Sequence, residues 1–423
     1  MKVIENLKVK EKIYVEKLNN GLNVIIIPKK DIKKKYMIWG TNYGSNDNKF
    51  VVDNEVIEVP NGVAHFLEHK LFEQENGINS LDKLTSLGVE ANAYTTNDHT
   101  AYLFECTDNF YEAMTELMDY VQHPYFTDEN VEKEKGIIGQ EIMMYDDLPE
   151  WKVYLNALKA MYHKNPIKID ITGTIETIGK IDKEILYKCY NTFYIPSNML
   201  LVICGDFEPE KIIHEIEERL IKKEEKNVPK RIYPNEPETI AKSEILEEHD
   251  VSQPIYAIGI KDKIIKDGDS KTLVKRHIAI EILLNLLIGK SSSLYKKLYN
   301  KGTLHMVPNF DYEFSKTYAH ILISGYSKDP YQIYRQIKNE IEVLKKDIKE
   351  EDVERIKKTI YGGYIREYEN VSDVSRMFLA DYFKGVNSFD YLEEIWKVDL
   401  EFLKEIIENV FKEDKMVISV VKI

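Results

Sequence analysis

The sequence predicts an α+β protein made of two homologous half-domains, each with an antiparallel-rich sheet packed against helices. Three observations lead to this prediction. The chain of 423 residues is longer than one ordinary domain. Segments typical of strands alternate with segments typical of helices in both halves. The closing run "FKEDKMVISVVKI" also resembles "FYIPSNMLLVICGDF", which ends the first half, so the plan is expected to repeat.

The first half contains apolar and β-branched runs with turn residues at their ends, which are typical of strands. These segments are 21–29, 36–47, 91–107 and 196–207. Helices are expected from about residue 62 and over 127–145 and 208–226. The helix over 127–145 has a clear start, because Thr127 can cap it and acidic residues fill its first turn.

The stretch "EEKNVPKRIYPNEPETIAKSE" is charged, contains three prolines and has no period, which is typical of a linker. We therefore predict an N-terminal half-domain over 1–225, a linker over 226–245 and a C-terminal half-domain over 246–423. Beyond the linker, strands are expected at 252–263 and 318–327, a long helix at 271–290, and mostly helix over 329–368.

Composition and charge exclude several classes of function. The net charge of −14 argues against nucleic acid or an anionic membrane as partner, since both require a basic surface. The three cysteines have no C-x-x-C spacing, so a disulfide framework is not expected. The charged start has no signal-peptide pattern, and the most apolar stretch, 278–289, is too short to span a bilayer. These features predict a cytoplasmic protein.

The motif "HFLEH" at 65–69 is the strongest indication of a metal site in the sequence. On a helix, His65 and His69 lie one turn apart on the same face and can present two imidazoles to one ion. Glu68 lies beside that ion, where it can take a proton from bound water. A catalytic zinc site needs a third protein ligand and keeps one position for water. The alternative is a histidine pair that shares a helix without binding metal.

The third ligand is expected from the helix over 127–145. Glu134 and Glu141 are two turns apart on one face, and spacing alone does not choose between them. Gly136 and Gly139 each cost about 1 kcal/mol in a helix relative to alanine. We therefore expect their backbone to approach a neighbouring element closely, with the HFLEH helix as the candidate.

At this point the sequence resembles the pitrilysin/insulinase-type metallopeptidases, or inverzincins, which carry H-x-x-E-H. Five segments carry the resemblance in order along nearly the whole chain. They are "NGVAHFLEH", "ANAYTTNDHTAYLFE", "EKGIIGQEIMMYDDLP", "YIPSNMLLVICGDF" and "GKSSSLYKKLYNKG". The resemblance is to the small bacterial processing-peptidase-like branch, in which two chains of this length form a clamshell.

The resemblance implies a role for each candidate residue. It makes His65, His69 and Glu141 the zinc ligands and Glu68 the general base. Glu134 becomes a catalytic helper whose carboxylate supports a ligand. Asn92 and Ala93 match residues that hold the substrate peptide as an added strand.

The sequence departs from the family pattern in its second half. Relatives carry an arginine and a tyrosine near the scissile bond, but the matching stretch "LYNKGTLH" has Tyr299 and His305 at those places. Tyrosine cannot supply the charged fork of arginine. Some members pair a zinc-bearing chain with a zinc-less chain that has the arginine and tyrosine. We therefore expect a heterodimer with such a homologous subunit rather than a homodimer.

The predicted function is a zinc metalloendopeptidase that hydrolyses peptides or short unfolded segments. The alternative is a non-catalytic subunit of a protease-like heterodimer, which either supports assembly or binds peptide without turnover. The substrate and the pathway stay open at this stage.

Overall fold

The computed structural model describes residues 1–221, 225–266 and 268–423. The chain divides into two compact units, and each unit combines three separate segments. Unit 1 consists of Met1–Ile142, Asp170–Tyr233 and Ile365–Phe383. Unit 2 consists of Met143–Ile169, Pro234–Tyr364 and Lys384–Ile423. This division differs from the predicted consecutive halves, 1–225 and 246–423, because each unit includes a segment from the other half.

Unit 1 is built on a seven-stranded sheet in the order β1-β2-β3-β9-β4-β8-β7. Every neighbouring pair is antiparallel except β3 and β9. A small sheet, β10-β5-β6, lies in the same unit. The strands are β1 (Lys2–Asn6), β2 (Glu11–Lys17), β3 (Asn23–Pro28), β4 (Lys35–Thr41), β5 (Lys49–Val52), β6 (Glu55–Glu58), β7 (Glu90–Thr95), β8 (Thr100–Cys106), β9 (Met199–Gly205) and β10 (Lys230–Arg231).

Helices cover both faces of this large sheet. The helices that belong to unit 1 are α1 (Val63–Leu71), α2 (Ser80–Ser86), α3 (Phe110–Gln122), most of α4 (Asp128–Asp146), α6 (Ile175–Ile178), α7 (Lys183–Phe193), α8 (Pro209–Arg219) and nearly all of α13 (Val371–Lys384). A short 3₁₀ turn, η2 (Pro196–Asn198), precedes β9. Side chains from α1, α2, α3 and α7 share one buried apolar core with the sheet.

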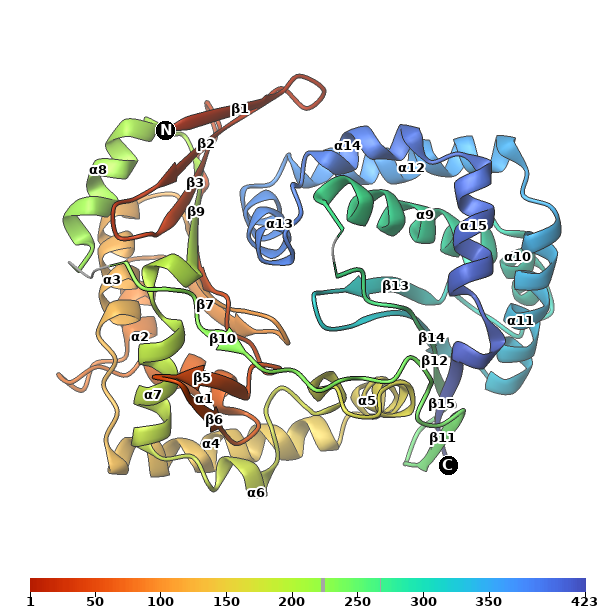
Figure 1. Ribbon diagram of the computed structural model, residues 1–423, viewed down its shortest axis with the longest axis horizontal. Coiled ribbons are helices and arrows are strands. Elements are labelled where there is room, and N and C mark those ends of the chain that lie inside the picture. The colour runs from red at the N-terminus through yellow and green to blue at the C-terminus, as the bar shows by residue number, and fades with distance from the viewer. Residues whose placement is uncertain (222–224, 267) are drawn as a thin grey trace. The chain divides into compact units, whose positions relative to one another are not determined.

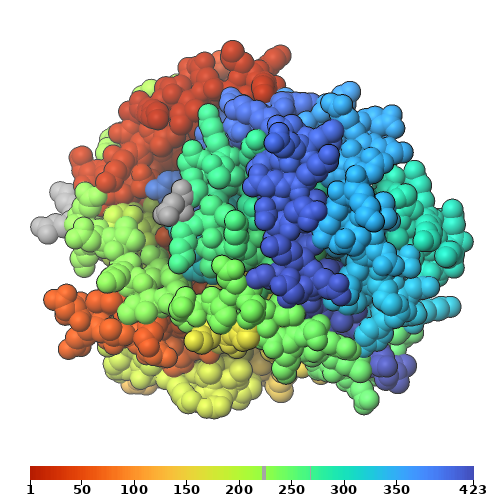
Figure 2. Space-filling model, turned by 45° about the vertical axis from the view of Figure 1, so that its right-hand side comes forward, coloured from red at the N-terminus to blue at the C-terminus, as the bar shows by residue number. Residues whose placement is uncertain are grey.

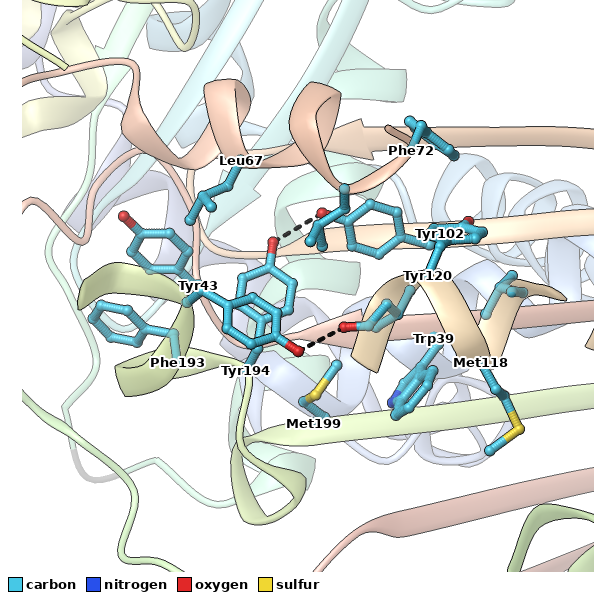
Figure 3. Packing of buried hydrophobic residues seen from close by; sticks show 14 of the residues in the cluster. Trp39, Tyr43, Leu67, Phe72, Tyr102, Met118, Tyr120, Phe193, Tyr194 and Met199 are labelled. Atoms are coloured by element: carbon cyan, nitrogen blue, oxygen red, sulfur yellow. Dashed lines mark hydrogen bonds between the residues drawn. The ribbon is translucent and has the colours of Figure 1, made fainter. Parts of the chain in front are cut away.

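Figure 3 shows the part of this core that lies beneath α1. Leu67 and Phe72 reach from α1 and its C-cap onto the sheet, where the Phe72 ring lies 5.9 Å from the ring of Tyr102. The Tyr102 and Tyr194 hydroxyls are hydrogen-bonded at 2.9 Å, so these buried polar groups are satisfied. The core therefore anchors α1 on the sheet along its apolar side.

Unit 2 repeats this plan with a five-stranded sheet in the order β11-β15-β12-β14-β13. Only β11 and β15 are parallel, as β3 and β9 are in unit 1. The strands are β11 (Glu244–Glu248), β12 (Ile255–Lys261), β13 (Asn309–Phe314), β14 (Ala319–Tyr326) and β15 (Met416–Lys422). Thus β9 and β15, the two segments whose sequences resemble each other, occupy equivalent places. The predicted α+β architecture with two related, antiparallel-rich halves is confirmed.

The helices of unit 2 are α5 (Pro149–Met161), α9 (Ser270–Ile288), α10 (Ser293–Asn300), α11 (Pro330–Lys346), most of α12 (Glu350–Glu367), α14 (Asp390–Glu394) and α15 (Leu400–Val410). Short 3₁₀ turns are η1 (Pro166–Lys168), η3 (Ile395–Lys397) and η4 (Glu413–Lys415). Helices α9, α11 and α15 contact one another. The outer sides of α11 and α15 form neighbouring blue bands in Figure 2.

Two helices explain why the units are not consecutive halves. Helix α5 belongs to the first half of the sequence but packs on β12 and β15 of unit 2, as Figure 1 shows. Helix α13 comes from the second half but packs on the sheet of unit 1. A glycine makes room in each case. A Cβ on Gly40 of β4 would lie 2.8 Å from Leu379, and one on Gly259 of β12 would lie 2.7 Å from Met161. Each half thus supplies one helix to the other unit.

Most expected elements are present with shifted ends. The cap of α4 is confirmed, since the Asn130 N–H donates to Thr127 Oγ1 at 3.1 Å. The strand character expected over 91–107 is confirmed: the segment contains β7 and β8, which form a hairpin with a turn at 96–99. The predicted linker contains β10, and β11 begins inside it. The end of the helix expected over 208–226 falls partly on 222–224, outside the described residues.

Among the described residues, one segment is long and apolar enough to cross a membrane, Ser270–Asn300. About 61% of its most apolar window is buried inside the protein. Its apolar side chains, such as Ile278, Leu283 and Leu287, belong to the core of unit 2. This pattern is that of a core helix, for which hydropathy alone is weak evidence of a membrane span.

Candidate metal centre

Helix α1 carries the HFLEH motif, and its start is set by Gly62. This residue adopts φ = 94°, in the left-handed region that favours glycine. A Cβ there would lie 2.6 Å from the Thr172 carbonyl oxygen. The apolar Phe66 and Leu67 of α1 are fully buried in the core of unit 1. The backbone turn and the core together fix the direction in which the histidines project.

The two histidines and Glu141 form one group. The ligand atoms of His65, His69 and Glu141 all lie within 4.8 Å of one another. The Oε2 atom of Glu141 is 3.7 Å from His65 Nε2 and 3.6 Å from His69 Nε2. Ligand atoms that share one tetrahedral zinc at about 2.0–2.1 Å are separated by roughly 3.3–3.5 Å. The spacing therefore fits one small cation between these three side chains.

Glu134 lies behind His69 rather than within this group. Its Oε1 is 3.0 Å from His69 Nδ1. Its Oε2 is 3.4 Å from the Lys70 ammonium nitrogen. A carboxylate on the far nitrogen of a ligating histidine orients the ring and leaves Nε2 for the metal. This is the position expected for a supporting carboxylate.

The glycines of α4 do not bring its backbone close to α1, as was predicted. A Cβ on Gly136 would meet nothing within 4 Å, and one on Gly139 would meet only Ile175 Cδ1, at 3.4 Å. The expected close approach to α1 is therefore wrong. The two helices meet through the side chains of His69, Lys70 and Glu134.

Glu68 is buried beside the group without being part of it. Its Oε2 accepts a hydrogen bond of 2.6 Å from Thr95 Oγ1 on β7. Burial raises the pKa of the Glu68 carboxyl, and the Thr95 hydrogen bond opposes that rise. A carboxylate with a raised pKa and one fixed hydrogen bond is suited to accept a proton.

The electrostatics suit a cation with nitrogen and oxygen ligands. Burial, together with the neighbouring His69, lowers the pKa of His65 to about 3, so this imidazole is neutral. Burial alone would lower the pKa of His69, but the hydrogen bond to Glu134 and nearby carboxylates outweigh it and raise the pKa. For Glu141, burial is the largest cause of a raised pKa; the nearby carboxylates of Asp170 and Glu134 raise it further, and His69 opposes the rise. Imidazole and carboxylate donors are those that zinc uses.

Strand β7 places Asn92 and Ala93 at the edge of the sheet in unit 1. The Thr96 N–H donates to the His99 carbonyl across the hairpin turn. Antiparallel pairing alternates, so the backbone groups of Ala93 and Thr95 face the free edge. Within the described part of the chain, the Ala93 N–H donates only to the Asn92 side-chain oxygen, at 2.8 Å. Strand β7 thus offers backbone groups to an additional strand.

A pocket of about 390 Å³ extends from His69 of the metal group to this edge. Its walls come from α1, α2, α4, β7 and the segment between α1 and α2. The lining residues are Glu68, His69, Phe72, Glu73, Gly77, Asn79, Leu81, Asn92, Ala93, Lys133, Glu134 and Ile137. One cavity is therefore lined by the predicted base Glu68, the predicted ligand His69, the supporting Glu134, and Asn92 and Ala93 of the edge strand.

Two residues of this site were missed by the sequence analysis. Lys70 is fully buried and contacts both Glu73 and Glu134. Thr95 holds the predicted base. A lysine directly after a ligating histidine is a visible signal, but its burial is not visible in the sequence.

In unit 2, Tyr299 is 54% exposed and its ring lies 5.8 Å from the ring of Tyr295, and His305 is exposed.

We expect Glu141→Gln to lose most bound zinc, because an amide is a poorer ligand than a carboxylate. Glu134→Gln should lose less, since a supporting partner typically changes metal affinity by about 10–100-fold. The measurement is metal analysis of both variants after dialysis against a weak chelator. Equal zinc content in Glu141→Gln and the unchanged protein would contradict the ligand assignment.

Comparison with known proteins agrees with the fold and with the family that the motifs resemble. Residues 57–175 match the family model described as insulinase (peptidase family M16). Residues 180–360 match the model described as the peptidase M16 inactive domain. The uncharacterized zinc protease YmfH of Bacillus subtilis (strain 168) is 38% identical over 423 residues, covering 99% of this chain and 98% of that protein. The uncharacterized zinc protease YmxG of the same strain is 23% identical over 365 residues, covering 84% of this chain and 87% of that protein.

Solved structures agree as well. The crystal structure of an M16-like peptidase from Alicyclobacillus acidocaldarius has a TM-score of 0.93 and 36% identity, covering 99% of both chains. A protease from Helicobacter pylori has a TM-score of 0.84 at 20% identity, covering 98% of this chain and 100% of that one, which shows the fold alone. Since both halves match models of one family and a relative of 38% identity spans nearly the whole length, this chain belongs to the insulinase family of peptidases, peptidase family M16.

Proposed function

We propose that this protein is a zinc metalloendopeptidase that cleaves peptides or short unfolded segments. The observation that carries the proposal is the His65, His69 and Glu141 group with the Glu68 carboxylate beside it. The relatives named as zinc proteases support the same reading. Bound zinc would polarise the peptide carbonyl and lower the pKa of a water molecule.

Each residue of the site would then have its own role in hydrolysis. Glu68 takes the proton of the attacking water and is held for this by Thr95. Glu134 keeps the His69 ring in place through Nδ1. The free edge of β7 would align the peptide by backbone hydrogen bonds, which suits an extended segment as substrate. Water attacks directly, so no covalent acyl-enzyme forms.

The test combines metal analysis with hydrolysis of a quenched fluorescent peptide. We expect one zinc per chain, loss of cleavage with a chelator and recovery on adding zinc. A protein that binds zinc and peptide but never cleaves it, with or without a partner chain, would instead be a non-catalytic binding subunit. The family model matched at 180–360, described as an inactive domain, makes this second outcome worth testing.

We expect Ala93→Pro to lower kcat/KM by about 2–12-fold, because proline removes one N–H that would pair with the peptide. Proline is tolerated on an edge strand, so the fold and the zinc content should stay unchanged. Ala93→Ser is the matched control, since it changes the side chain at the same position but keeps the backbone N–H. Unchanged kcat/KM in Ala93→Pro would show that the peptide does not pair with β7 at this residue.

We also propose a partner and a location. Tyr299 cannot supply the charged fork of an arginine beside the scissile bond, so a homologous zinc-less chain that carries the arginine and the tyrosine would complete the site. The two chains would form the two halves of a clamshell, and a homodimer is less favoured. The charge and the cysteine pattern make the cytoplasm the proposed location.

A further inference from the structure

Lys70 is an unusual residue in the candidate metal centre. It follows His69 on α1, and its side chain is fully buried. Lysine is almost never buried to this extent unless its charge is paired. Its ammonium contacts Glu73, and it lies 3.4 Å from Oε2 of Glu134. Both acids line the pocket, whereas Lys70 joins them from behind.

The contacts of Lys70 bear on a choice that spacing leaves open. Glu134 and Glu141 are equivalent by helical spacing, but their surroundings differ. Glu134 has both oxygens engaged, Oε1 by His69 Nδ1 and Oε2 by Lys70. Among the described residues, Glu141 receives no hydrogen bond, and its Oε2 lies 3.7 Å from His65 Nε2 and 3.6 Å from His69 Nε2.

We propose that Lys70 is a positioning residue that holds Glu134 on His69 and thereby reserves the metal position for Glu141. The inference deepens the proposed zinc site and rests on it. Without the ammonium, Oε2 of Glu134 loses its partner, and the carboxylate is free to rotate off Nδ1. An unrestrained carboxylate this close to a zinc site is itself a competing oxygen ligand.

A purely structural role makes a different prediction. If Lys70 only neutralised the two acids that it contacts, removing Glu73 together with the lysine would restore zinc affinity, coordination and stability. If Lys70 positions Glu134, the double change relieves the charge but still leaves Glu134 unrestrained. The variants Lys70→Met and Lys70→Met/Glu73→Gln separate these roles. Lys83→Met is the matched control, because Lys83 also pairs with a buried acid, Glu116, but away from the metal group.

The experiment uses the full chain without activity as its readout. Zinc affinity is measured by competition with a chromophoric chelator, metal coordination by the absorption spectrum of the cobalt(II) form, and stability by thermal unfolding of the metal-free protein. We expect Lys70→Met to weaken zinc binding by about 10–100-fold and to change the cobalt spectrum. The double variant should regain thermal stability but keep the weak affinity and the altered spectrum. Lys83→Met should leave zinc affinity unchanged.

Wild-type zinc affinity and cobalt spectrum in the double variant would overturn the proposal, even if Lys70→Met itself does not fold. This outcome is distinct from failure of the proposed function. A wild-type protein that binds zinc but cleaves no peptide would remove only the peptidase assignment. The measured role of Lys70 in metal binding would stand.

Discussion

Glu68→Gln is expected to lower the hydrolysis of a quenched peptide by about 10²–10⁴-fold, the usual loss when a general base is removed. The zinc content should stay at one ion per chain, because Glu68 is outside the His65, His69 and Glu141 group. Glutamine keeps the size of the side chain and its hydrogen bond with Thr95, but it cannot accept a proton. The measurement is kcat/KM together with metal analysis.

The control for this change is Glu132→Gln on the exposed side of α4, where the acid pairs with Lys135. An exposed ion pair contributes little, so this variant should match the unchanged protein in activity and zinc content. A fully active Glu68→Gln protein would show that another group activates the water. Loss of zinc in Glu68→Gln would show instead that Glu68 takes part in metal binding.

The second large effect concerns the partner. The purified chain alone should cleave weakly or not at all. Adding a homologous chain that carries the arginine and the tyrosine should raise turnover strongly, because each donor aimed at the developing oxyanion typically contributes about 10²–10³-fold. The measurement is turnover of the quenched peptide as the second chain is titrated in.

Variants in both chains make this prediction specific. Changing the partner's arginine should abolish the gain, whereas Tyr299→Phe in this chain should matter little. Rapid cleavage by the purified chain alone, lost in His305→Ala, would contradict the heterodimer. That result would make His305 the donor and this chain self-sufficient.

Several features were predictable from sequence because they depend on neighbours along the chain. The i, i+4 spacing puts His65 and His69 on one helical face wherever the helix packs. The capping of α4 by Thr127 is equally local. The repeat of the closing strand predicted two related sheets, and β9 and β15 do take equivalent places. The family resemblance came from local motifs of the same kind.

Other features depend on contacts between distant segments, and the tertiary structure alone decided them. Strand-like residues were recognised over 91–107, but the pairing of β7 with β8 around a turn at 96–99 was not. Helix α13 packs close to Gly40, and helix α5 packs close to Gly259. The hydrophobic periodicity of the sequence does not show that these helices belong to the opposite units.

The choice between Glu134 and Glu141 shows the same division most sharply. Two glutamates seven residues apart on one helix have the same spacing relations, so the sequence by itself determined only that one of them faces the histidines, and the family resemblance named Glu141. The tertiary structure supplies a physical reason: His69 Nδ1 and the buried Lys70 engage both oxygens of Glu134, which leaves the oxygens of Glu141 toward the two Nε2 atoms.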